Sequence, residues 1–151
     1  MIIITESNIE KAKNLIKKAI ANKEKPIIVI ARDDNYNRKL LEYSKFDILL
    51  SPEAGQERKD SLRQLDSGLN HVLAKIASKN KIAIGIDIKD IESIANKKEK
   101  ALRLGRIIQN IKICRKAKCK IKALNYKDKK DAFSFLTSLG ASTQQAKEAI
   151  S

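Results

Sequence analysis

The residues with the clearest capacity for chemistry are Asn70, His71 and Lys75, which lie within residues 66–86 (DSGLNHVLAKIASKNKIAIGI). The apolar spacing predicts a helix over 66–80 that leads into a buried strand, with these three side chains on its exposed face. A histidine can act as a general base, although the spacing is more typical of a polar surface or cap residue. His71 is the only histidine of the chain, so a metal site built from several histidines is excluded.

A second polar group lies on the helix predicted over residues 97–117. Arg103, Arg106 and Asn110 are spaced i, i+3 and i+7, which puts them on one helical face. Ala101, Leu104, Ile108 and Ile111 repeat along the other side and are expected to face the core. Arginine and asparagine side chains can bond phosphates, sugars and base edges, so the exposed face predicts an RNA contact. The further residues assigned to it are Gln109, Lys112 and Arg115.

A third candidate is the basic loop predicted over residues 125–130, which contains Lys129 and Lys130. It follows a strand predicted over 119–124, and ligands of α/β proteins usually bind beyond the carboxyl ends of strands. The chain has neither a glycine-rich phosphate loop nor a serine nucleophile elbow. No catalytic residue is therefore assigned. A carboxylate metal site is not excluded, but no spacing favours one, and no metal ligand is assigned.

The charge of the chain is concentrated in one block. Residues 97–130 contain 14 Lys/Arg and 2 Asp/Glu, a net charge of +12 out of +14 for all 151 residues. Residues 1–96 contribute only +3 and residues 131–151 contribute −1. A local excess of this size favours a binding surface for a polyanion, most often a nucleic acid, over a charge that serves only solubility.

The cysteines and the lengths of the apolar runs indicate the cellular compartment of the protein. Cys114 and Cys119 match no metal motif and are expected to be buried free thiols. The sequence has no apolar run of membrane-spanning length and no signal peptide at its start. We therefore expect a cytoplasmic protein without a membrane contact.

The remaining pattern predicts one domain over residues 1–151 of the α/β class. Short isoleucine-rich runs are typical of parallel strands that are buried on both faces, and strict alternation with helices implies helical crossovers. The expected strands cover 2–4, 27–31, 47–51, 81–88 and 119–124. The expected helices cover 9–22, 36–44, 66–80, 97–117, 131–139 and 143–150, the first capped by Ser7 and the last by Ser142.

Three segments taken together resemble the archaeal ribonuclease P protein component 3 family, the relatives of the eukaryotic thirty-kilodalton subunit. They are SGLNHVLAKIASKNKIAIGI, RIIQNIKICRKAKCK and DAFSFLTSLGASTQQAKEAI, within residues 26–151. The resemblance implies a TIM-like (β/α) barrel, incomplete here because fewer strands are predicted than a barrel needs.

The resemblance also implies a function. The family assists a catalytic RNA that removes the 5′ leader from precursor tRNA, so the chain itself is expected to be an inactive, non-catalytic subunit. Its expected partners are ribonuclease P RNA, precursor tRNA through the holoenzyme, and ribonuclease P protein component 2. No cofactor is expected in the protein, whereas Mg²⁺ is expected for the RNA. Two alternatives stay open: a metal-dependent phosphoesterase on a related barrel, and a basic protein-interaction scaffold.

Overall fold

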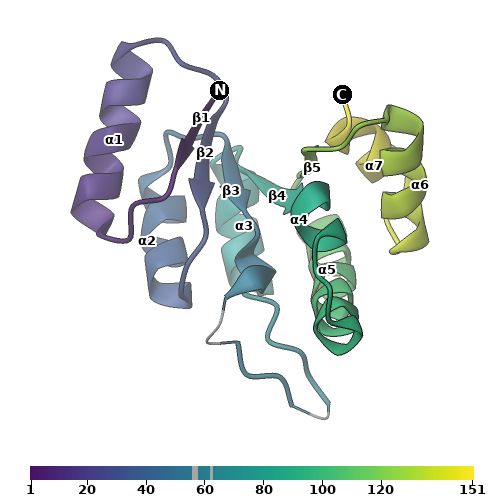
Figure 1. Ribbon diagram of the computed structural model, residues 1–151. Coiled ribbons are helices and arrows are strands. Elements are labelled where there is room, and N and C mark those ends of the chain that lie inside the picture. The colour runs from purple at the N-terminus through teal and green to yellow at the C-terminus, as the bar shows by residue number, and fades with distance from the viewer. Residues whose placement is uncertain (56–57, 62) are drawn as a thin grey trace.

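The computed structural model describes residues 1–55, 58–61 and 63–151. Strands and helices alternate along the chain, with a short 3-10 helix after the third strand (Figure 1). The strands are β1 (Ile2–Ile4), β2 (Ile27–Ile30), β3 (Ile48–Leu50), β4 (Ala83–Asp87) and β5 (Ile121–Leu124). The helices are α1 (Ile9–Ala21), α2 (Asp34–Tyr43), η1 (Pro52–Ala54), α3 (His71–Lys79), α4 (Ile88–Glu92), α5 (Lys97–Ala117), α6 (Lys129–Ser138) and α7 (Thr143–Ala149).

The five strands form one parallel sheet in the order β1-β2-β3-β4-β5. Each strand therefore pairs with its sequence neighbours through a helical crossover, which confirms the predicted α/β class with parallel strands. The same sequential order is found around a (β/α) barrel. Here β1 and β5 are the two edges of the sheet.

The two faces of the sheet carry different apolar clusters. Ile27 and Val29 point into a large core that the sheet shares with the helices, whereas Ile28 belongs to a small cluster on the opposite face with Ile48 and Leu50. Ile28 and Val29 are both fully buried. This burial on both faces explains why the strands are continuous apolar runs without polar alternation.

Local capping explains where several helices begin and end. Asn8, rather than the expected Ser7, caps α1, because its side chain accepts a hydrogen bond from the amide of Lys11. The cap predicted at Ser142 is confirmed, with a reciprocal bond between Ser142 and Gln145. Gly140 has φ 99°, a left-handed conformation that suits the residue after a helix end.

Three predicted boundaries are wrong. The α3 helix begins at His71, five residues later than expected, because Gly68 has φ 74° and Asn70 supplies the cap. Lys129 and Lys130 lie in the first turn of α6 rather than in a loop, because Asp128 caps that helix. The short helix α4, formed directly after β4, was not predicted, and its first residue Ile88 was assigned to the strand expected over 81–88.

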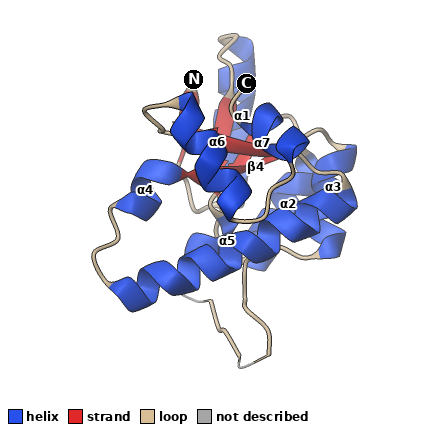
Figure 2. Cartoon of the chain, turned by 90° about the vertical axis from the view of Figure 1, so that its right-hand side faces the viewer, coloured by secondary structure: helices blue, strands red, loops and turns tan. Residues whose placement is uncertain are grey.

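The orientation of α5 also differs from the prediction. Its buried face contains Ile107, Ile111 and Cys114, whereas Ile108 is 45% exposed. Figure 2 shows α5 running across the molecule beside α4 and α6. Cys114 and Cys119 are buried free thiols, as predicted. Within the described residues, the chain has no helix with the length and apolarity required to span a bilayer.

Gly68 sets the path of the chain between β3 and α3. A Cβ atom placed there would lie 2.0 Å from the carbonyl oxygen of Pro52, and φ is left-handed. We expect Gly68→Ala to lower the free energy of unfolding by about 3 kcal/mol, because it combines a backbone clash with left-handed strain. Urea denaturation followed by circular dichroism measures this.

Gly105→Ala is the matched control, since the nearest atom to a Cβ there is the mobile Cδ1 of Leu65, at 3.0 Å. Its change is expected to stay within about 1 kcal/mol, because alanine also improves helix propensity. Equal losses for the two variants would contradict the role assigned to Gly68.

Candidate nucleic-acid interface

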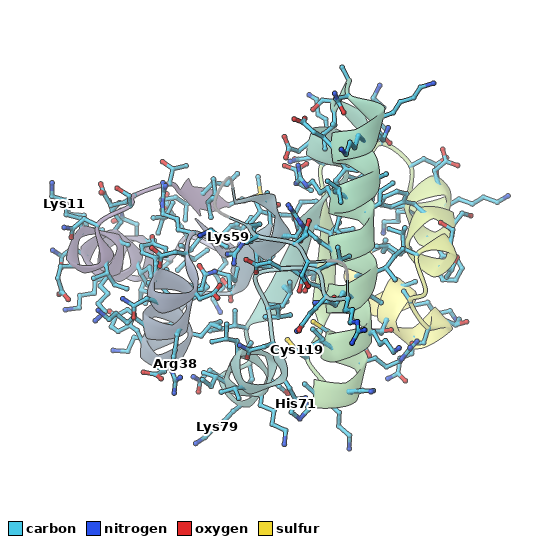
Figure 3. The ribbon with its side chains drawn as sticks, turned by 90° about the horizontal axis from the view of Figure 1, so that it is seen from below. Lys11, Arg38, Lys59, His71, Lys79 and Cys119 are labelled. Carbon is cyan, nitrogen blue, oxygen red and sulfur yellow. The ribbon has the colours of Figure 1, made fainter. Side chains whose placement is uncertain are left out.

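The start of α3 presents the first group of predicted site residues at the surface. Asn70 caps the helix by accepting a hydrogen bond from the amide of Leu73 at 2.9 Å. His71 is the first helical residue, and Lys75 follows one turn later; both side chains are exposed. His71 is labelled beside α3 in Figure 3. The structure thus brings these three residues together on one exposed surface, as predicted.

Arg103 of α5 lies in a buried ion pair instead of on an exposed face. It is 9% exposed, and its Nε donates to Oε2 of Glu53 at 3.2 Å. Its Nη1 donates to Oδ2 of Asp90 at 2.5 Å. Glu53 belongs to η1 and Asp90 to α4, so this arginine joins three separate elements at the carboxyl end of the sheet.

Glu53 is 1% exposed, and its burial raises the pKa of its carboxyl from 4.5 to about 7. The charge of Arg103 opposes this rise without cancelling it. A buried carboxylate loses its hydration, and one cation with a single hydrogen bond compensates only part of that loss. Among the described residues, Nη2 of Arg103 has no partner, which fits incomplete compensation.

Arg106 holds the loop that connects β3 to α3, residues 51–70, called the β3–α3 loop below. Its Nη2 lies 2.8 Å from Oδ2 of Asp60, and its Nη1 donates to the carbonyl of Glu53 at 3.1 Å. The hydrogen bond from Arg106 is the main reason that the pKa of Asp60 is lowered. Arg106 therefore ties two points of the loop to α5.

Two amides of α5 extend this attachment along the helix. Gln109 donates to the carbonyl of Leu65 and to Oγ of Ser67, both at 3.0 Å. Asn110 is 4% exposed and donates to the carbonyl of Ser67 at 3.0 Å. Four polar residues on one face of α5 thus hold the β3–α3 loop: Arg103, Arg106, Gln109 and Asn110.

The predicted exposure of this face is therefore wrong. Arg103 and Asn110 are buried and Arg106 is 14% exposed at its side chain, because the β3–α3 loop covers them. Periodicity could not reveal this, since the covering residues lie about 40 to 50 positions earlier in the chain. An RNA contact by these residues remains a prediction.

The other predicted basic residues are exposed. Lys112 lies on the outer face of α5, and Lys129 and Lys130 begin α6. Arg115 is exposed as well, although its Nη1 donates to the carbonyl of Gly140 at 2.9 Å and so links α5 to the turn before α7. These cations sit on two different helices that flank β5.

Arg58 is an anchoring residue that the sequence analysis missed. Its side chain is 6% exposed and bonds Asp34 at 2.7 Å and Asp66 at 3.1 Å. Its Nη2 also donates to the carbonyl of Arg32 at 2.8 Å. The available signal was an arginine in a loop that also contains Asp60 and Asp66, but no fixed spacing marks such a cluster. Within the described residues, no group of three or more His, Cys, Asp or Glu is placed to hold a metal ion.

The fold and this surface define a parallel α/β protein with sequential strands and an exposed set of cations. Among curated proteins, the chain is similar to ribonuclease P protein component 3 of Methanococcus vannielii, with 31% identity over 111 residues, 73% of this chain and 44% of the relative. The protein of the same name from Methanococcoides burtonii is 39% identical over 85 residues, 56% of this chain and 31% of the relative. The chain thus spans less than half the length of these relatives.

A solved structure agrees with these relatives. The chain resembles, with a TM-score of 0.79 and 26% identity, a chain in the cryo-EM structure of archaeal ribonuclease P with mature tRNA. The match covers 98% of this chain and 62% of that chain. A search of protein-family models finds no match. The resemblance to archaeal ribonuclease P protein component 3 that the sequence indicated is confirmed by the curated relatives, and the solved structure is that of an archaeal ribonuclease P.

The raised pKa of Glu53 predicts a pH dependence of stability. Because the folded state binds this proton more tightly than the unfolded state, the stabilisation is complete below pH 4.5 and is lost as the pH rises through about 7. Glu53→Gln should flatten the slope of unfolding free energy against pH in this window, which spans roughly 3 kcal/mol for the unsubstituted chain. Denaturant titrations at several pH values measure it.

Glu92→Gln is the matched control, because Glu92 is an exposed carboxylate on neighbouring α4. It should leave the slope unchanged. Asp60 and Asp66 do not interfere, since their lowered pKa values place their titration below 3.8. An unchanged slope in Glu53→Gln would contradict the assignment.

Arg106 gives a second prediction. Arg106→Ala should lower the free energy of unfolding by about 3 kcal/mol, because it leaves the Asp60 carboxylate and the Glu53 carbonyl without their partner. Lys112→Ala, one exposed cation on the same helix, should change it by less than about 0.5 kcal/mol. Hydrogen exchange should also rise at the described loop residues only in the Arg106 variant, and equal behaviour of both variants would count against the anchoring role.

Proposed function

We propose that this chain is an RNA-binding protein subunit of ribonuclease P, which assists the catalytic RNA in removing the 5′ leader from precursor tRNA. The observation that carries the proposal is the similarity of 98% of the chain, at a TM-score of 0.79, to a chain of an archaeal ribonuclease P solved with tRNA. The similarity to curated component 3 proteins supports it independently.

In this proposal the exposed polar residues contact RNA. They comprise the start of α3, the outer face of α5 and the first turn of α6. The residues are Asn70, His71, Lys75, Lys112, Arg115, Lys129 and Lys130. Their cations neutralise phosphates, and the release of counterions makes such binding strongly dependent on salt. The basic block of residues 97–130 supplies the long-range attraction that speeds encounter with RNA.

Arg103, Arg106, Gln109 and Asn110 act indirectly in the same proposal. They hold the β3–α3 loop against α5 and thereby fix the orientation of the helix that carries Lys112. Their loss is expected to lower stability first and RNA affinity only as a consequence.

Apolar side chains on the same helix support a protein partner, which we propose to be ribonuclease P protein component 2. Leu102 is 38% exposed and Ile108 is 45% exposed, and the two lie among cations on the outer half of α5. Exposed apolar groups rimmed by charge are typical of protein contacts. We propose that the chain works in the cytoplasm, supplies no catalytic group and has no cofactor of its own, while Mg²⁺ serves the RNA.

Reconstitution tests the proposal. Precursor-tRNA cleavage by an archaeal ribonuclease P RNA and component 2 should become faster at limiting Mg²⁺ when this chain is added. RNA affinity should fall by about 10³ to 10⁵ between 50 and 200 mM salt if 6 to 10 phosphates are contacted. Lys112→Gln combined with Lys129→Gln should reduce both effects without lowering the thermal midpoint.

Two outcomes would favour the alternatives. Hydrolysis of a phosphoester by the chain alone with Mn²⁺ or Zn²⁺, abolished by chelation, would support a phosphoesterase. Stimulation of cleavage that is unaffected by the two lysine substitutions and by salt would support a scaffold that contacts only component 2.

A further inference from the structure

The four turns that lead from a helix into a strand share an unusual residue choice. Each has a lysine with positive φ: Lys23 before β2 (55°), Lys45 before β3 (65°), Lys81 before β4 (58°) and Lys118 before β5 (58°). Left-handed backbone costs roughly 1 to 2 kcal/mol for a residue with a side chain, and helix ends of this kind usually have glycine there.

Three of these turns have the same hydrogen bonding. The amides of Glu24, Ile82 and Cys119 each donate to the carbonyl five residues earlier, so the lysine before each of them occupies the left-handed position of a Schellman turn. The turn between α6 and α7 has the same bond, from Ala141 to Leu136, but does not lead into a strand. It has Gly140 at the equivalent position.

Lysine therefore replaces glycine only where the turn lies at the amino end of the sheet. The carbonyl ends of the helices attract cations there, which accounts for some positive charge. That attraction is available to any lysine of the last helical turn, as Lys79 in α3 illustrates, and it does not require the left-handed position. The attraction of the helix carbonyls therefore does not explain why lysine occupies the left-handed position, and its charge needs a second explanation.

The same end of the sheet is hollowed and basic. A cavity of about 890 Å³ extends from the strand starts, where Lys25, Lys81 and Lys120 line it, to Asn125 and Tyr126 beyond the carboxyl end of β5. Six lysines in the turns and strand starts of this end are exposed, and within the described part of the chain none of the six forms an ion pair. They are Lys23, Lys25, Lys45, Lys81, Lys118 and Lys120.

Four acidic residues lie at the same end and do not balance these charges, and one of them, Glu42, is paired with Arg38 at 3.0 Å. The carboxylate of Asp47 accepts the backbone amide of Ile27 at 2.7 Å. Glu148 accepts the side-chain amide of Gln144 at 3.0 Å, and Glu24 lies in the first of the turns. Lys122, on the sheet itself, is already held by the carbonyl of Ser151 at 2.8 Å.

We propose that the amino end of the sheet is a second RNA-binding surface, which takes the phosphate backbone of one RNA strand across the row of turn lysines. Neighbouring strands lie about 4.8 Å apart, so four turns spread charge over roughly 15 Å. A row of that length extends well beyond a single phosphate group and can contact several phosphates of one strand. An extended polyanion fits such a row better than a single small anion. The proposal rests on the proposed function and assigns that function a further surface, distinct from the starts of α3 and α6.

The test uses glycine, because glycine relaxes the left-handed turns while it removes their charge. In the full chain, Lys23→Gly, Lys81→Gly and Lys118→Gly together should keep or raise the thermal midpoint. Affinity for transcribed ribonuclease P RNA of Methanococcus vannielii should fall, and the slope of log affinity against log salt should decrease by about 2 to 3. A purely structural role cannot produce opposite changes in stability and affinity.

The control removes three lysines located after the carboxyl ends of strands: Lys11→Gln, Lys59→Gln and Lys89→Gln. Lys11 and Lys59 are labelled in Figure 3. This control should lower the salt slope by less than 1.

If the unsubstituted chain binds RNA with a steep salt slope and the glycine variant binds with the same slope, the second surface is refuted while the proposed function survives. If the unsubstituted chain binds no RNA, the proposed function fails. Loss of component 2 binding with RNA binding intact would refute the RNA assignment.

Discussion

The ion pair between Arg103 and Glu53 is the interaction on which the carboxyl side of the molecule depends. It joins two residues that are 50 positions apart, and Glu53 is almost completely buried. Breaking such a pair from one side leaves a buried charge without compensation, at a cost of about 3 to 5 kcal/mol. Because the pair fixes the rotation of α5 about its axis, it decides which α5 residues face the β3–α3 loop and which face solvent.

Arginine and lysine side chains differ in how often they form ion pairs within the chain. Arg38, Arg58, Arg103 and Arg106 form ion pairs within the chain, whereas Lys13 is the one lysine that does so among the described residues. The planar guanidinium group can bond two or three fixed acceptors at once, and the ammonium group is a hydrated point charge on a flexible stem. The net charge of α5 therefore overstates the charge that is free to bind a partner. Most of the free charge belongs to its lysines.

The strands could be predicted from the sequence because parallel strands buried on both faces are apolar runs, as in β2 and β4. The α5 face could not, because Arg103 and Asn110 are buried by polar contacts with a distant loop while Ile108 stays exposed. The start of α3 was missed because Asp66, a good capping residue by type, instead accepts bonds from Lys59 and Arg58 in that loop. Periodicity and capping rules predict a residue's environment correctly when its contacts are close in sequence. They fail when a distant segment supplies those contacts.

The sequential strand order has a consequence for how the chain folds during its synthesis. Every strand pair joins strands that are neighbours in the chain, so the sheet contains no pairing that must wait for a distant strand. Each pairing still joins residues 20 to 37 positions apart, so a whole helical crossover must close before the next strand can dock, which makes parallel sheets slow to fold. A growing chain can nevertheless add one βα layer at a time as it leaves the ribosome, with each new strand docking on a template that already exists. The Arg103–Glu53 pair closes only when α5 emerges, which makes the carboxyl side the last part to become rigid.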